Sequence, residues 1–176
     1  MLKPNEKRIL AIDLRSRSFG FAVFEGPTRL LDWGVKSFRQ GTNAVKTPAS
    51  EKLAALMDDF PPSTIVLKKR DSDTKKRAEM HNALLREATK RRIPIRLLSR
   101  NGVKNAFADC NHNKYTIAAA LTKQLPELTP RLPQVRKIWK SEDYRMSIFD
   151  AAALGVAYFT RGKPAEPESG VYEQVH

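Results

Sequence analysis

Cysteine is almost absent from this chain of 176 residues, in which Cys110 stands alone. A single cysteine excludes a disulfide framework and a cysteine metal cluster, so we interpret Cys110 as a small packed residue. The sequence also lacks an apolar stretch long enough to span a bilayer, and its N-terminus has no apolar signal-peptide core. We therefore expect a cytoplasmic protein that has no membrane partner.

Acidic residues are scarce relative to basic ones. The chain has 32 Lys and Arg against 19 Asp and Glu, which gives a formal net charge of +13. Such an excess suits a polyanionic partner, and nucleic acid fits better than an acidic membrane surface. The alternative is a basic protein whose charge serves only solubility. Hydrophobic residues make up 41% of the chain, which is typical of a globular protein with a core.

The first half of the sequence predicts strands before helices. Two apolar runs, at about 8–14 and 18–25, flank a short polar turn, and a third strand runs through 30–38. A helix is predicted from Thr47-Pro48 to just before Pro61, because threonine and proline suit its first positions. A buried strand at 64–67 follows. The next helix, at about 74–91, carries an apolar face formed by four residues, which are His81, Leu84, Leu85 and Ala88.

The second half predicts one more strand and then helices only. The strand covers 93–98, and short helices cover about 100–108 and 114–125. Residues 126–143 are rich in proline and positive charge and include Trp139. The last helix, at about 143–161, is apolar nearly all round, which indicates burial against a sheet. We predict an α/β domain over 1–162, with a five-stranded mixed sheet (a three-stranded meander plus two parallel strands) flanked by helices, and a disordered tail over 163–176.

One aspartate stands out where the first strand ends. Asp13 is placed either to meet a metal ion at the edge of the sheet or to cap local backbone amides. Ile12-Asp13, a Ser/Arg-rich turn, Gly20 and the strand around Ala22 together resemble the opening of the RuvC-type Holliday-junction resolvases. The resemblance implies an RNase H-like fold and a catalytic role for Asp13. Where the family usually has Pro-Gly after this aspartate, the chain has Leu14-Arg15.

The resemblance also implies the chemistry. In this family two divalent ions, Mg²⁺ or Mn²⁺, are held by acids from the first strand, the fourth strand and the last helix, and they drive phosphodiester hydrolysis. Asp150, in the run Phe149-Asp150-Ala151, resembles the acid of the last helix. The further acid one turn earlier would fall on Ser147, and the strand-four glutamate is replaced by Lys68. We therefore expect only weak metal binding.

Lys68 takes the place of a metal ligand. A protonated amine repels a divalent ion, but it could pair with Asp13 and Asp150 and neutralise the site without metal. Asp71 or Asp73 could substitute as metal ligands, although helix capping is the interpretation we favour for both.

Basic residues are predicted to contact nucleic acid around this site. Lys104, in Asn101-Gly-Val-Lys104, and Lys114 resemble the family's lysines beside the scissile phosphate. Arg15 and Arg17, in the turn after Asp13, could also hold phosphate.

Two functions follow from these observations. The first is a Mg²⁺-dependent, structure-selective endonuclease for branched DNA, acting in DNA recombination or repair. The second is a RuvC-like fold with impaired catalysis that binds DNA, RNA or a protein partner, or an RNA-processing factor of the related YqgF type. The sequence leaves open whether the chain forms a homodimer.

Overall fold

A single mixed sheet of five strands organises the protein. The computed structural model describes residues 7–38, 48–70, 72, 74–108 and 113–160. The strands are β1 (Arg8–Leu14), β2 (Ser18–Glu25), β3 (Leu30–Ser37), β4 (Thr64–Lys68) and β5 (Ile95–Leu98), in the order β3-β2-β1-β4-β5. β1, β2 and β3 form an antiparallel meander, and β4 and β5 run parallel to β1. The predicted fold class, a meander plus two parallel strands, is confirmed.

The central strands are apolar on both faces because helices cover both faces. Along β1, Ile9 and Ala11 point into one hydrophobic cluster, whereas Leu10 and Ile12 point into the other. This alternation follows the two-residue period of a strand. A strand buried on both sides therefore reads as a continuous apolar run, as β1 does.

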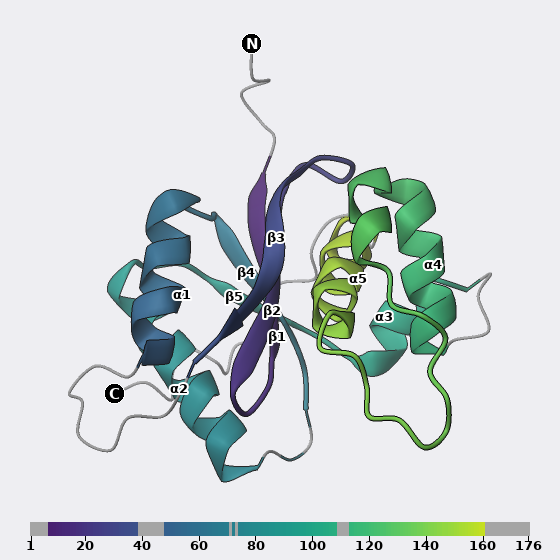
Figure 1. Ribbon diagram of the computed structural model, residues 1–176. Coiled ribbons are helices and arrows are strands. Elements are labelled where there is room, and N and C mark those ends of the chain that lie inside the picture. The colour runs from purple at the N-terminus through teal and green to yellow at the C-terminus, as the bar shows by residue number, and fades with distance from the viewer. Residues whose placement is uncertain (1–6, 39–47, 71, 73, 109–112, 161–176) are drawn as a thin grey trace.

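Helices pack on the two faces of the sheet in two groups (Figure 1). On one face lie α1 (Pro48–Asp59) and α2 (Lys75–Lys90). On the other lie α3 (Arg100–Ala106), α4 (Lys114–Gln124) and α5 (Met146–Thr160), with a 3-10 helix, η1 (Pro126–Arg131), after α4. Among the described residues, no helix has the length and apolar character needed to cross a membrane.

The face of α2 that packs on the sheet differs slightly from the predicted one. Met80, Leu84 and Ala88 are fully buried, whereas His81 and Leu85 are only partly buried. The buried stripe follows the i, i+4, i+8 row, because the helix is rotated so that residue 80 rather than residue 81 faces the sheet. Thr47, the predicted cap of α1, and the predicted tail at 163–176 lie outside the described residues.

Helix α5 packs so closely on the sheet that glycine is required at the contact. A Cβ atom on Gly20 of β2 would collide with the backbone carbonyl of Ser147, and one on Gly155 would collide with the ring of Phe24. Because Gly20 pairs with Asp13 in the sheet, this close approach also brings the start of α5 to the end of β1.

Candidate functional site

The carboxyl ends of two parallel strands bring the predicted site residues together. Ile12 of β1 pairs with Leu67 of β4, so Asp13 and Lys68, one position further on, lie next to each other at the same edge of the sheet. In open α/β sheets ligands bind at this edge. Asp150 reaches it from the second turn of α5, in an otherwise apolar stretch.

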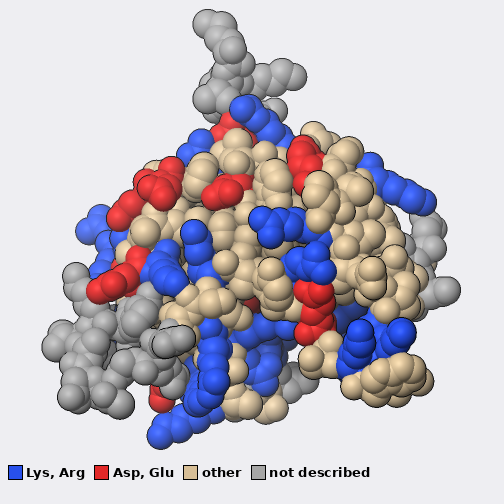
Figure 2. Space-filling model, in the orientation of Figure 1, with Lys and Arg blue, Asp and Glu red and all other residues tan. Residues whose placement is uncertain are grey.

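These residues line a cavity of about 750 Å³. Among the described residues, eight basic side chains line it against three acidic ones. The basic residues are Arg15, Lys68, Lys69, Arg70, Arg77, Arg100, Lys104 and Lys114, and the acidic residues are Asp13, Glu142 and Asp150. Figure 2 shows Lys and Arg side chains gathering towards the lower edge of the molecule in that view.

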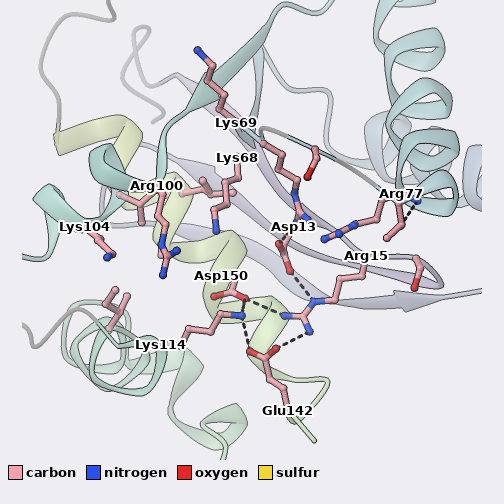
Figure 3. Close-up of a pocket in the computed structure, with 18 residues that line it drawn as sticks. Asp13, Arg15, Lys68, Lys69, Arg77, Arg100, Lys104, Lys114, Glu142 and Asp150 are labelled. Atoms are coloured by element: carbon pink, nitrogen blue, oxygen red, sulfur yellow. Dashed lines mark hydrogen bonds and ion pairs between the residues drawn. The ribbon is translucent and has the colours of Figure 1, made fainter.

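Arg15 is the centre of the ion pairs in the cavity (Figure 3). Its Nε donates to Asp13 Oδ2 at 2.9 Å, and its Nη2 donates to Asp150 Oδ2 at 3.0 Å. Its Nη1 donates to Glu142 Oε2 at 3.3 Å. One guanidinium therefore bridges the two aspartates and a third carboxylate, a geometry that its planar set of donors allows.

Two further cations complete the network. Lys114 Nζ lies 2.8 Å from Glu142 Oε1 and 3.3 Å from Asp150 Oδ2. Arg70 Nη2 lies 3.6 Å from Asp13 Oδ1. Each of the three acids is thus neutralised by at least one basic side chain.

The ion pairs expected from Lys68 are made by Arg15 instead. Within the described part of the chain, Lys68 forms no ion pair within 4.0 Å, although it lines the cavity and interacts with Asp150 and Asp13 at longer range. The physical reason is the arrangement of donors. The ammonium of a lysine is a compact point charge, whereas the planar guanidinium of Arg15 donates from Nε, Nη1 and Nη2 and lies between the two aspartates.

Burial changes the ionisation of the site. The pKa of Asp150 is raised by burial and by the charge of Asp13, against the effect of Lys114 and Arg15. The pKa of Lys68 is lowered by burial and by Arg70 and Lys114, although Asp150 and Asp13 oppose that shift.

The third carboxylate shifts in the opposite direction from Asp150. Burial alone would raise the pKa of Glu142, but hydrogen bonds and charges from Lys114 and Arg15 outweigh it, and the pKa is lowered. Glu142 is therefore held as an anion between two cations.

The donor set does not fit a pair of divalent ions. Across the described ranges, no three His, Cys, Asp or Glu residues lie close enough together to hold a metal ion. The guanidinium of Arg15 lies between the two aspartates, and an amine replaces the acid expected on β4. Ser147, at the position of the family's further acid, is fully buried, and its hydroxyl has no hydrogen-bond partner among the described residues. Asp71 and Asp73, the predicted substitutes, lie outside the described residues.

Most of the predicted nucleic-acid contacts lie together, with one exception. Arg15, Lys104 and Lys114 line the cavity. Arg17 is exposed and does not line it, because it lies two residues further along the turn. Glu142 was not predicted as a site residue; its one local signal is that it is the first acid after a long basic stretch.

Two solved structures of a RuvC protein share this fold. The structure of Thermus thermophilus RuvC in complex with a Holliday junction substrate has a TM-score of 0.62 and 17% identity, covering 88% of this chain and 96% of that one. A second Thermus thermophilus RuvC structure has a TM-score of 0.60 and 19% identity over the same shares. The yeast mitochondrial Holliday junction resolvase Ydc2 has a TM-score of 0.49 and 16% identity, over 88% of this chain and 79% of its own.

No protein-family model matches the sequence, and a search of curated proteins finds no match either. The chain has a RuvC-type, RNase H-like fold.

Proposed function

We propose that this protein binds branched or duplex DNA through the basic cavity at the end of β1 and β4, and that it does so without a metal ion. One observation supports the proposal most directly. The guanidinium of Arg15 bridges Asp13 and Asp150, at the place where a RuvC-type site would hold divalent ions. The Thermus thermophilus RuvC of the same fold is bound to a Holliday junction, which supports DNA as the ligand.

Phosphate is the group that the cavity suits. Eight basic side chains among the described residues exceed the charge of the three acids, and a strand carries one negative charge per nucleotide. Lys114 and Lys104 are the residues that we assign to phosphate contacts. Binding would release counterions, so that affinity falls steeply as salt rises.

Glu142 occupies part of the cavity in this structure. Its carboxylate accepts hydrogen bonds from both Arg15 and Lys114, as a phosphate oxygen would. A bound phosphate would compete with Glu142 for these donors. Opening of this contact therefore accompanies DNA binding in our proposal.

The second candidate function is a metal-dependent endonuclease for branched DNA, with Asp13 and Asp150 as ligands and Asp71 as a third. The position of both aspartates at the cavity favours it. It requires Arg15 to leave the space between them, and Lys68 to lie beside a divalent cation that its charge would repel. We therefore rank it second.

The proposal is tested with a labelled four-way junction and the matching duplex, titrated with the protein over a range of salt concentrations. Lys114→Ala should weaken binding and reduce the slope of log K against log salt by about 0.9 for one lost phosphate contact. Lys123→Ala is the matched control, because Lys123 is an exposed lysine of the same helix that does not line the cavity. Equal effects of both substitutions, or binding that ignores salt, would contradict the proposal.

A further inference from the structure

Exposed apolar side chains concentrate in one short segment. Within the described ranges, the large hydrophobic residues with high exposure are Val135, Ile138, Trp139 and Tyr144, and all lie between η1 and α5. Ile138 is 94% exposed and Trp139 is 78% exposed. Exposed apolar groups gathered in this way mark a contact surface more often than scattered ones do.

A turn fixes the two most exposed residues at a corner of the chain. The backbone N–H of Lys140 donates to the carbonyl of Lys137 at 3.0 Å, which closes a four-residue turn with Ile138 and Trp139 at its centre. Arg136 Nε also donates to the carbonyl of Lys140 at 2.7 Å. These hydrogen bonds fix the backbone of the turn at which the exposed Trp139 lies.

Positive charge surrounds the exposed ring. Lys137 Nζ lies 5.6 Å from the centroid of the Trp139 ring. Residues 131–141, which we call the tip segment, contain four basic residues and no acidic one; the basic residues are Arg131, Arg136, Lys137 and Lys140. A flat aromatic ring set among cations suits a nucleobase and its phosphate.

The tip segment leads directly into the cavity. Glu142, three residues after Trp139, is bound to Arg15 and Lys114. Three residues span at most about 11 Å. A strand whose phosphate binds Lys114 therefore has a neighbouring nucleotide within reach of the exposed ring.

We propose that Trp139 stacks on an unpaired base of single-stranded or branched DNA whose backbone lies in the cavity. This inference rests on the proposed function. It adds a substrate preference, because a fully stacked duplex offers no open base face away from its ends. A second copy of the chain or another protein is the competing occupant, but the charge of the tip segment opposes self-association.

The first experiment measures the affinity of the natural protein and of Trp139 variants for DNA. Trp139→Ala should weaken binding to single-stranded and junction DNA by roughly 5- to 150-fold, the range that aromatic stacking provides. It should leave binding to a blunt duplex of the same length nearly unchanged. The slope of log K against log salt should stay constant, because a stack releases no counterion. Trp139→Phe should restore most of the affinity, and Val135→Ala is the matched control, since it removes exposed apolar surface without removing a ring.

The second experiment tests whether a DNA base contacts the ring of Trp139. The chain has two tryptophans, so Trp33→Phe leaves Trp139 as the sole tryptophan, whose emission can be excited selectively over that of the tyrosines. Single-stranded DNA should quench its fluorescence, whereas the duplex should bind without quenching it.

Two outcomes would overturn the inference while leaving the proposed function intact. One is wild-type affinity of Trp139→Ala for every DNA. The other is a dimer that Trp139→Ala dissociates while affinity for DNA stays the same. Absence of all DNA binding by the natural protein would instead overturn the proposed function itself.

Discussion

The guanidinium of Arg15 lies between Asp13 and Asp150. If it is removed, we expect the two aspartates to bind a metal ion in its place. In Arg15→Ala, Asp13 and Asp150 lose donors at 2.9 Å and 3.0 Å. Both carboxylates then carry negative charge side by side, and like charges destabilise each other in a partly buried site. The variant should therefore be less stable than the natural protein.

The magnitude follows from how buried the groups are. Breaking a fully buried pair costs about 3–5 kcal/mol, and an exposed pair contributes about 0.2–1 kcal/mol. The side chain of Arg15 is 27% exposed, and those of Asp13 and Asp150 are 8% and 25% exposed. Asp13 keeps Arg70 at 3.6 Å, so we expect a loss of about 1–3 kcal/mol. For a domain of this size that lowers the melting temperature by about 2–12 °C.

Thermal melting with and without Mn²⁺ measures both effects. Mn²⁺ should raise the melting temperature of Arg15→Ala and leave that of the natural protein almost unchanged. Arg100→Ala is the matched control, since it removes the same charge from the same cavity but leaves the bridging guanidinium in place. Addition of Lys68→Glu to Arg15→Ala supplies a third carboxylate and should increase the response. If Mn²⁺ raises the melting temperature of the natural protein as much as it raises that of Arg15→Ala, the guanidinium does not take the place of a metal ion.

Three further predictions concern other contacts of the site. Glu142→Gln removes the carboxylate that competes with phosphate, so junction affinity in a binding titration should rise several-fold; a fall would contradict this role. Burial and neighbouring cations lower the pKa of Lys68 from 10.5, and DNA favours its charged form, so affinity should fall as pH rises through that lowered pKa. Lys68→Arg should abolish this loss of affinity at high pH. A pH profile of Lys68→Arg that matches that of the natural protein would refute the prediction. Gly20→Ala should cost about 1–3 kcal/mol in denaturant unfolding, because its Cβ meets the backbone of Ser147. Gly34→Ala is its control, with its nearest contact at 3.3 Å, and equal losses would show that the close approach is unimportant.

The strands and most helices could be predicted because their signals are local. The apolar run at 9–12 is long enough for one strand, and the polar turn before Gly20 separates it from the next strand. The buried face of α2 could not be predicted residue by residue, because Met80 and His81 both fit an apolar stripe and only packing against the sheet selects between them. Such a choice depends on contacts far away in the sequence.

Residues of the site could be predicted only where they belong to a recognisable sequence motif. Asp13 and Asp150 stand in recognisable local patterns, and the structure brings both to one cavity. The bridging role of Arg15 depends on side-chain reach towards a residue 135 positions away. Glu142 could not be predicted either, because no spacing rule links it to Arg15 or Lys114. Long-range ion pairs of this kind need the fold before they can be assigned.

Binding of a labelled four-way junction in EDTA and in Mn²⁺, at matched ionic strength, tests the central claim most directly. The claim is that Arg15 and its neighbouring cations bind DNA phosphate without a metal ion. We predict equal affinity in the two buffers and an intact junction after prolonged incubation with Mn²⁺. Binding that requires Mn²⁺, or cleavage of the junction into nicked duplexes, would contradict the claim.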